Sequence, residues 1–275
     1  MSVDVSVLES VGALESLGDL LRHWRKLRGL SQLALALEAG SSARHLSFVE
    51  SGRAQPSRAM VLRLAEALRL SLRDQNLLLG AAGFAPAYPE SPLDSAALER
   101  ARMALELMLA KQEPYPALVM NRSWEVIMTN RATGRLFGLL ELDPQALDQG
   151  FNGLRSFFHP EGLKRFIRNW PVAAGMTLAR MQRDLALTLD PGLFALMEEV
   201  KTYPGVSALL AGGAGLPAGD PVVPLEIEHD GRVWSWFTTI ATFGTPQDVT
   251  LQELKVEMFF PMDPETEEGA KRLLG

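Results

Sequence analysis

The stretch SQLALALEAGSSARHLSFVESGRAQPSRAMVLRLAEAL, residues 31–68, decides the fold of the N-terminal part of the chain. A helix-turn-helix crosses two short helices so closely that one contact residue must be small, and Ala36 meets this need. The tight turn between the helices favours glycine at a positive φ, and Gly40 follows four residues later. The second helix must bury two apolar residues one turn apart, and Leu46 and Val49 have that spacing. Together these features predict a helix-turn-helix.

Helical patterning continues on both sides of this stretch. The predicted helices cover Leu17–Arg28, Gln32–Ala39, Ser42–Ser51, a segment that opens at Pro56–Ser57, and Leu72–Ala82. Serine before a helix and glycine after it support these bounds. We therefore expect an all-α domain of five helices over residues 17–82.

Charge is distributed unevenly along the 275 residues. The whole chain carries a formal net charge of −6, whereas residues 17–73 hold ten Lys or Arg and four Asp or Glu. A compact basic segment on an acidic remainder indicates a local polyanionic partner. Chance clustering of solvated helix faces is the alternative.

The stretch quoted above resembles the XRE, or phage-repressor-like, helix-turn-helix domain, over about Leu17–Leu79. The resemblance implies that Ser42–Ser51 is the recognition helix, lying in the major groove of a double-stranded DNA operator. It also implies an ion pair between Arg25 and Glu50. The candidate DNA-binding residues are Gln32, Ser42, Ala43, Arg44, His45, Ser47, Phe48 and Arg53.

The side-chain chemistry of these candidates suggests different roles. Arg44 can bond guanine bidentately, with a phosphate contact as the alternative. The resemblance implies that Gln32 contacts a phosphate. Arg53, in the loop after the recognition helix, is also expected at a phosphate, because such contacts position a domain without reading sequence. Phe48 either reads bases through apolar contact or packs on the domain, and His45 is expected to pack or to contact phosphate.

Beyond the helices, residues 81–92 (AAGFAPAYPESP) are typical of a linker. Strand patterns follow at Ala117–Asn121, Trp124–Thr129, Val222–His229, Arg232–Phe243 and Val249–Phe260, with helices between the second and third. This order predicts a PAS-like α+β domain with an antiparallel sheet. We place an N-terminal extension at 1–16, the helix-turn-helix domain at 17–82, a linker at 83–94, the PAS-like domain at 95–265 and a C-terminal tail at 266–275.

Three segments of this second part resemble the MmyB-like ligand-binding domain, over roughly residues 95–265. They are PYPALVMNRSWEVIMTNRATGRLFG, LRSFFHPEGLKRFIRNW and TFGTPQDVTLQELKVEMFFPMD. The resemblance implies a PAS-like sensor for a small apolar or amphipathic effector, with fatty-acid-like molecules as the favoured class. The chain departs from the family in carrying Trp234 and Trp236, which could shorten the pocket.

Aromatic and methionine side chains on inward strand faces supply a candidate apolar pocket. Its predicted lining is Trp124, Met128, Phe137, Phe158, Trp170, Trp234, Trp236 and Phe243. His159 or Arg168 is the candidate donor for a carboxylate head. The alternatives are an ordinary core for the apolar residues, a helix-terminus hydrogen bond for His159 and a solvated face for Arg168.

In the last predicted strand, apolar and charged residues alternate. Leu254, Val256, Met258 and Phe260 share one face, and Glu253, Lys255 and Glu257 share the other. We expect the apolar set to face the interior.

Several functional classes find no support in the sequence. The chain has no cysteine, no run of 18 apolar residues and no signal-peptide core, so we expect a cytoplasmic protein without a membrane partner. No two of the four histidines have metal-ligand spacing, and Walker and GxSxG motifs are absent. We therefore expect no enzyme, no cofactor and no metal.

The sequence as a whole predicts a sequence-specific DNA-binding transcriptional regulator whose PAS-like domain senses a small effector. One recognition helix touches few bases, so we expect a homodimer, with Leu93–Gln112 as the candidate interface. The alternative is a DNA-binding regulator whose C-terminal domain only dimerises and binds no ligand.

Overall fold

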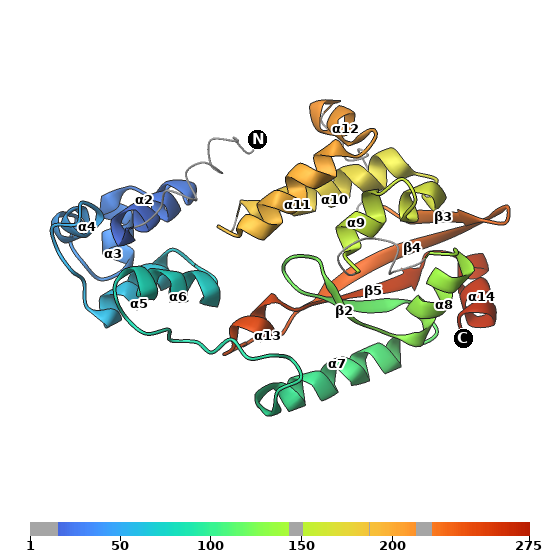
Figure 1. The fold of residues 1–275 in the computed structure, drawn as a ribbon, viewed down its shortest axis with the longest axis horizontal. Coiled ribbons are helices and arrows are strands. Elements are labelled where there is room, and N and C mark those ends of the chain that lie inside the picture. The colour runs from blue at the N-terminus through green and yellow to red at the C-terminus, as the bar shows by residue number, and fades with distance from the viewer. Residues whose placement is uncertain (1–15, 143–150, 187, 213–221) are drawn as a thin grey trace. The chain divides into compact units, whose positions relative to one another are not determined.

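The computed structural model describes residues 16–142, 151–186, 188–212 and 222–275 (Figure 1). The chain forms two compact units, which are described separately. The first unit contains the residues up to Ser91 together with Ala186–Pro191 and Thr245–Gln252. The second unit contains Pro92–Leu185, Gly192–Gly244 and Glu253–Gly275.

Short helices make up the described N-terminal part of the first unit. They are α2 (Leu17–Leu27), α3 (Gln32–Glu38), α4 (Ala43–Glu50), α5 (Arg58–Ala67) and α6 (Leu72–Ala81). Each begins after a serine whose hydroxyl accepts a hydrogen bond from a backbone N–H of the first turn, which satisfies a donor the helix itself cannot pair. The prediction of a five-helix domain is confirmed.

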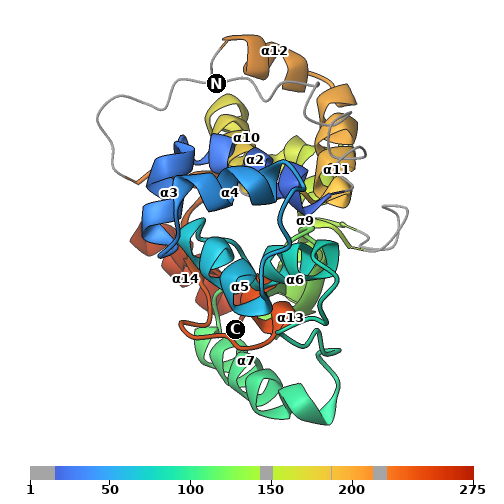
Figure 2. The same cartoon turned by 90° about the vertical axis from the view of Figure 1, so that its left-hand side faces the viewer.

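Helices α2, α3 and α4 pack around one apolar core (Figure 2). Trp24, Leu35, Leu46 and Leu64 lie in that core with almost no exposed surface. Gly40 ends α3 with a φ of 65°, a conformation that glycine adopts without a steric penalty. The small residue, the glycine and the buried pair predicted for a helix-turn-helix therefore take the expected positions.

Helices α2 and α4 come close together at Gly18 of α2. A Cβ atom at Gly18 would lie 2.4 Å from the carbonyl oxygen of Glu50, at the end of α4. Only a residue without a side chain allows the two helices to come so near. Gly18 therefore determines how close α4 lies to α2.

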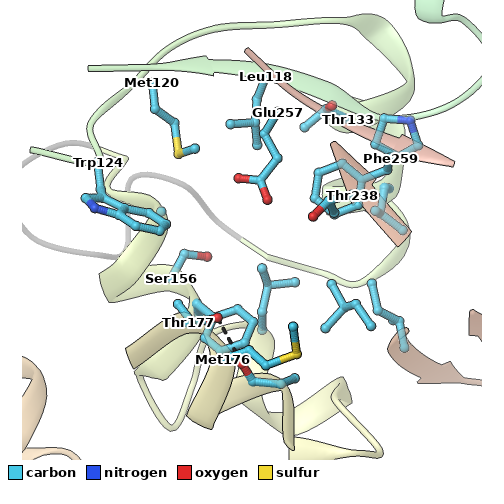
Figure 3. A pocket seen from close by; sticks show the side chains of 18 of the residues that line it. Leu118, Met120, Trp124, Thr133, Ser156, Met176, Thr177, Thr238, Glu257 and Phe259 are labelled. Atoms are coloured by element: carbon cyan, nitrogen blue, oxygen red, sulfur yellow. Dashed lines mark hydrogen bonds between the residues drawn. The ribbon is translucent and has the colours of Figure 1, made fainter. Parts of the chain in front are cut away.

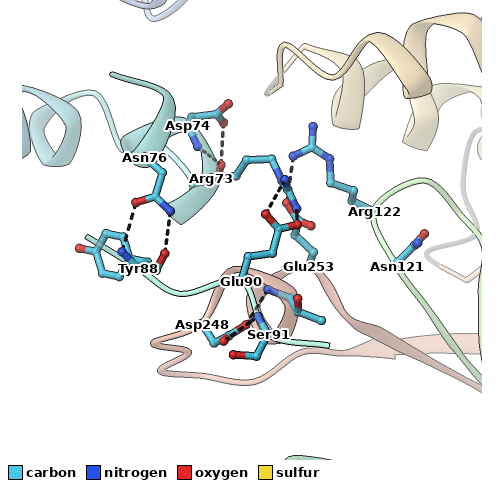
Figure 4. A network of polar contacts seen from close by, with 12 residues as sticks. Arg73, Asp74, Asn76, Tyr88, Glu90, Ser91, Asn121, Arg122, Asp248 and Glu253 are labelled. Atoms are coloured by element: carbon cyan, nitrogen blue, oxygen red, sulfur yellow. Dashed lines mark hydrogen bonds and ion pairs between the residues drawn. The ribbon is translucent and has the colours of Figure 1, made fainter. Parts of the chain in front are cut away.

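Segments distant in sequence complete the first unit (Figure 4). The amide oxygen of Asn76 accepts hydrogen bonds from Ala87 N and Tyr88 N, at 2.8 Å and 3.1 Å. The carboxylate of Asp248 accepts from Ser91 N at 3.2 Å. Residues of the predicted linker therefore make specific hydrogen bonds as far as Ser91.

A short helix, α13 (Val249–Glu253), joins this arrangement. Val249 N donates to Pro89 O at 2.8 Å, and Leu72 N donates to Gln252 Oε1 at 2.7 Å. The side chain of Leu189 is buried in the same core as Leu35 and Leu64. These contacts explain why two pieces of later sequence belong to the first unit.

The second unit is built on an antiparallel sheet with strand order β2-β1-β5-β4-β3. The strands are β1 (Ala117–Met120), β2 (Val126–Thr129), β3 (Leu225–His229), β4 (Arg232–Ala241) and β5 (Lys255–Pro261). In the register, Leu118 pairs with Glu257 and Thr239 with Met258. The prediction of an α+β domain with an antiparallel sheet is confirmed.

The other regular elements of the second unit are helices. Within the described residues they are η1 (Ala96–Leu98), α7 (Glu99–Gln112), α8 (Arg131–Leu139), α9 (Gly153–Phe158), η2 (Leu163–Phe166), α10 (Trp170–Leu185), α11 (Pro191–Thr202), α12 (Val206–Gly212) and α14 (Pro264–Leu273). Figure 1 shows α9 and α10 on one side of the sheet and α7 on the other.

Two elements differ from the sequence-based expectation. The predicted strand Val249–Phe260 is α13 followed by β5, because Asp248 Oδ1 accepts a hydrogen bond from Thr250 N and starts a helical turn. Residues 266–275, expected to be a tail, contain most of α14. This helix is capped by Asp263, and its Ala270 is fully buried.

Candidate functional site

Helix α4 presents the predicted recognition surface. Its buried side is formed by Leu46 and Val49, which are 1% and 2% exposed. Its start is fixed by Ser42, whose hydroxyl accepts from His45 N at 3.1 Å. Arg44 lies on the exposed side, and Arg53 is exposed in the turn after the helix. The helix and the turn after it therefore carry two exposed cations, Arg44 and Arg53, while Leu46 and Val49 hold the opposite side of the helix in the core.

Arg44 and Phe48 lie one turn apart on α4 and touch. The guanidinium carbon of Arg44 is 5.5 Å from the centre of the Phe48 ring. A cation over an aromatic face is attracted by the ring quadrupole, and an exposed pair of this kind contributes about 0.5–1 kcal/mol. Phe48 thus limits the rotamers of Arg44 before any partner binds.

The end of α4 is held by a buried carboxylate, Glu50. Its two oxygens accept hydrogen bonds from Arg25 Nε at 2.6 Å and Arg25 Nη2 at 3.0 Å, and Gln32 Nε2 donates to it at 2.8 Å. Arg22 Nη2 binds the Glu50 carbonyl oxygen at 2.7 Å. The predicted Arg25–Glu50 ion pair is confirmed.

These contacts shift the ionisation of both partners. Burial alone would raise the pKa of Glu50, but the hydrogen bonds from Arg25 and Gln32 outweigh it, so its pKa lies below the ordinary value of 4.5. The same hydrogen bond raises the pKa of Arg25. The pair is therefore charged at neutral pH and locks α2 to α4.

The other candidate DNA-binding residues differ in their freedom to reach a partner. Gln32 uses its amide nitrogen inside the unit, on Glu50. Ala43, His45 and Ser47 are partly buried on α4. Their contacts with DNA stay a prediction.

The second unit has a partly open cavity of about 180 Å³ between the sheet and α8, α9 and α10 (Figure 3). The strands contribute Leu118, Met120, Leu225, Ile227, Thr238, Glu257 and Phe259. The helices contribute Thr133, Leu136, Phe137, Gly153, Ser156, Phe157, Ala173, Met176, Thr177 and Arg180. The remaining lining residues are Pro116, Trp124, Phe151, Leu163, Val223 and Pro224. The wall is mostly apolar, with a few polar groups.

Two charged residues of opposite sign line this cavity. Arg180 Nη1 lies 3.4 Å and 3.5 Å from the two carboxylate oxygens of Glu257. The guanidinium also lies 4.2 Å from the centre of the Trp124 ring. Trp124 itself has a φ of 63°, a conformation that is rare for a bulky residue. A strained turn therefore holds the indole against the arginine.

Two of the predicted pocket residues, Trp124 and Phe137, line the cavity. Phe158 is fully buried, with its ring 5.4 Å from that of Trp170. Met128 lies on β2, in a shallower hollow next to α8. Phe158, Trp170 and Met128 therefore do not line the cavity between the sheet and α8, α9 and α10.

The two tryptophans expected to shorten the pocket do not line the cavity. Trp234 and Trp236 are buried in a cluster with Ala270 and Leu274, residues at the end of the chain, because α14 covers this part of the sheet. Phe243, just after β4, is partly buried outside the cavity.

The two predicted head-group donors also lie elsewhere. The ring nitrogen Nδ1 of His159 accepts a hydrogen bond from Glu161 N at 3.1 Å, so its role is the helix-terminus alternative. Arg168 is exposed, as the solvated-face alternative expects. Neither side chain lines the cavity.

Sequence reasoning missed the charged pair in the cavity. Strand alternation assigned Glu257 to the polar face of β5, yet Glu257 and Phe259 line the cavity. The apolar partners Val256 and Phe260 lie on the other face, where Phe260 stacks on Phe237. Arg180 carried no sequence signal, because a single arginine on a helix is usually solvated.

No group of three or more histidine or acidic side chains in the described ranges is placed to hold a metal ion. Among the helices that the structure describes, none has the length and apolarity needed to span a bilayer.

The first unit places the exposed side of α4 on a rigid helical base, and the second contains a small, partly open cavity. This combination defines the class of helix-turn-helix proteins that carry an additional ligand-binding domain. A family model described as helix-turn-helix matches residues 21–75, and one described as MmyB-like transcription regulator ligand binding domain matches residues 101–273. No curated protein matches the chain. The chain belongs to the MmyB-like transcription regulators and is a DNA-binding transcription regulator.

Proposed function

We propose that the chain binds an operator through α4 and that a small amphipathic effector in the cavity changes this binding. The observation that carries the proposal is the cavity of about 180 Å³, with an apolar wall and a few polar groups. Ligand pockets typically have this composition. A cavity of ~150 Å³ holds benzene, which has six non-hydrogen atoms, so by volume this one holds about seven. A fatty-acid-like tail of octyl length slightly exceeds that volume and would extend to the open side of the cavity.

The order of elements along the chain supports coupling between ligand binding in the cavity and the first unit. Helix α10, which lines the cavity, ends at Leu185, just before Ala186–Pro191 of the first unit. Strands β4 and β5, which also line it, flank Thr245–Gln252 of that unit. An effector that favours one arrangement of these segments would shift the population of DNA-binding states. This is a PAS-like sensing mechanism.

A homodimer fits the proposal, since a two-fold operator doubles the bases contacted. The predicted interface, Leu93–Gln112, contains α7. On this helix Met103 and Leu107 are 60% and 59% exposed, which is unusual for large apolar side chains. Sedimentation of the full chain tests this part. A monomer that still binds its operator at all concentrations would contradict it. A dimer of this kind would act in the cytoplasm.

The DNA-binding part is tested by selection of binding sites from random duplexes. Arg44→Ala should relax base preference at one position by about 1–3 kcal/mol. Arg53→Ala should weaken binding about equally on all sequences. Arg232→Ala, which removes an exposed charge from β4, is the matched control and should change neither property. Unchanged base preference in Arg44→Ala would exclude its role in reading bases.

The sensing part is tested with straight-chain alcohols and acids from butyl to hexadecyl. Ligands near octyl length should raise the melting temperature of the full chain and change its affinity for the selected operator. Ala173→Leu, which fills the cavity from α10, should abolish both effects while leaving operator binding intact. Leu189→Ala should keep ligand binding and lose its effect on DNA. If no ligand shifts the wild type, the C-terminal domain acts without an effector.

A further inference from the structure

Arg180 enters the cavity from α10 with one side of its guanidinium unpaired. The guanidinium carbon lies 4.2 Å from the centre of the Trp124 ring, which holds the group in place. Its Nη2 atom is buried and has no hydrogen-bond partner among the residues that the structure describes. A buried donor of a charged group is costly while it stays unpaired. The cavity therefore favours a ligand that brings an anionic oxygen to Arg180.

The other side of the guanidinium faces Glu257 of β5, whose carboxylate points into the cavity (Figure 3). The two carboxylate oxygens lie 3.4 Å and 3.5 Å from Arg180 Nη1. Strong charge-assisted hydrogen bonds are about 2.7–2.9 Å long, so this pair is loose. The two side chains are only 19% and 15% exposed, so water screens the pair little. Glu257 is thus a weakly held acceptor at the position where an anionic head would bind.

A ligand carboxylate and Glu257 would compete for Arg180. One guanidinium balances one negative charge, and two carboxylates beside it repel each other strongly inside a protein. The long contacts to Glu257 are weaker than contacts of ordinary length to a new head group. Because the Trp124 ring holds Arg180, Glu257 is the group that would move.

Loss of the Arg180–Glu257 contact would weaken the connection between α10 and β5. A second ion pair joins the same two elements, since Lys255 Nζ lies 2.6 Å from Asp184 Oδ2. Helix α10 and strand β5 adjoin the two stretches of later sequence that belong to the first unit. A change in how α10 and β5 are held together would therefore reach the ends of both stretches.

We propose that Glu257 competes with an acidic ligand for Arg180. Without a ligand, Glu257 pairs with Arg180 and helps to join β5 to α10. The anionic head of a ligand takes over the guanidinium, Glu257 is released, and the population of DNA-binding states shifts. This inference rests on the proposed function, in which the cavity takes a small-molecule effector. It adds the contact that the effector breaks and the residue that opposes its binding.

Calorimetric titration of the full chain with octanoate and octan-1-ol tests the competition. Glu257→Gln removes the competing charge and should tighten octanoate binding by about ten-fold, with a much smaller effect on octan-1-ol. Arg180→Met should weaken octanoate binding by at least about ten-fold. Glu228→Gln, at an exposed position on β3, is the matched control and should change neither affinity. Equal octanoate affinity in the wild type and Glu257→Gln would overturn the inference and leave the proposed function standing.

Operator affinity of the wild type gives a second comparison, which decides the inference even where Glu257→Gln does not fold. At saturation, octanoate should change operator affinity at least about five-fold more than octan-1-ol, because only the acid displaces Glu257. Ligand-free Glu257→Gln should shift operator affinity in the direction in which octanoate shifts the wild type. Equal effects of the two ligands would overturn the inference. If neither ligand binds in a way that Ala173→Leu abolishes, the proposed function itself is refuted.

Discussion

The guanidinium of Arg25 binds both carboxylate oxygens of Glu50, at 2.6 Å and 3.0 Å. The two side chains are 12% and 2% exposed, and they join α2 to the end of the recognition helix. The orientation of α4 therefore depends on a buried ion pair as well as on apolar packing.

Removing one partner of this pair should be costly. Glu50→Gln or Arg25→Met should lower the free energy of unfolding by about 3–5 kcal/mol, since an unpaired charge or unmatched donors stay buried. The double variant Arg25→Met/Glu50→Leu should regain much of the loss. Hydrogen exchange of the α2 and α4 amides measures the change in this unit. A single variant as stable as the exposed-pair control Glu198→Gln, for which we expect less than ~1 kcal/mol, would contradict the prediction.

The same pair should make the first unit sensitive to acid. The pKa of Glu50 is lowered in the folded state, below its ordinary value of 4.5. A group with a lowered folded pKa stabilises fully above its unfolded pKa, and this contribution is lost as pH falls through the folded pKa. Urea unfolding measured from neutral pH to below pH 4.5 gives the free energy of unfolding of the wild type and of Glu50→Gln. The wild type should be the more stable at neutral pH, and this difference should shrink as the pH falls. A constant difference across this range would argue against the ion pair as its source.

Two glycines on helices should respond in opposite ways to a methyl group. Gly18→Ala should destabilise the first unit by about 1–3 kcal/mol, because its Cβ would lie 2.4 Å from the Glu50 carbonyl oxygen. Gly80→Ala on α6, where the added Cβ meets nothing within 4 Å, should be neutral or stabilising by ~0.5–1 kcal/mol. Thermal unfolding of both variants measures the contrast. Equal effects would show that α2 and α4 can move apart freely.

Trp236 should act as a core residue and leave the ligand site unchanged. Its side chain is fully buried and does not line the cavity. Trp236→Ala should therefore cost about 3–5 kcal/mol of stability and leave the preferred ligand length unchanged. The thermal-shift series of alcohols and acids measures the loss of thermal stability and the preferred ligand length. A shift of the preferred length toward longer tails would mean that the indole bounds the cavity after all.

The helix-turn-helix could be predicted from the sequence because its signals are local. Ala36, Gly40, Leu46 and Val49 lie within 14 residues, and each has a steric role that one chain segment defines. The ion pair between Arg25 and Glu50 followed from resemblance to a family, since no local pattern joins residues so far apart.

The cavity was harder to predict, because it depends on which face of a strand meets the helices. Alternation in β5 correctly separates two faces, but the apolar set containing Val256 and Phe260 does not line the cavity. Burial of Trp234 and Trp236 depends on α14, a polar helix that the sequence presents as a tail. Arg180 reaches the cavity through packing on Trp124, a contact between distant segments.

The first unit draws on three separate stretches of chain, since Asp248 accepts a hydrogen bond from Ser91 N and Leu189 is buried beside Leu35. A recombination event with one crossover after residue 91 would graft a foreign helix-turn-helix onto this regulator without the residues that match its surface. Such a hybrid gene would need compensating changes at 186–191 and 245–252. Lineages of these regulators should therefore inherit their DNA-binding and ligand-binding halves together, and shuffling between them should be rare.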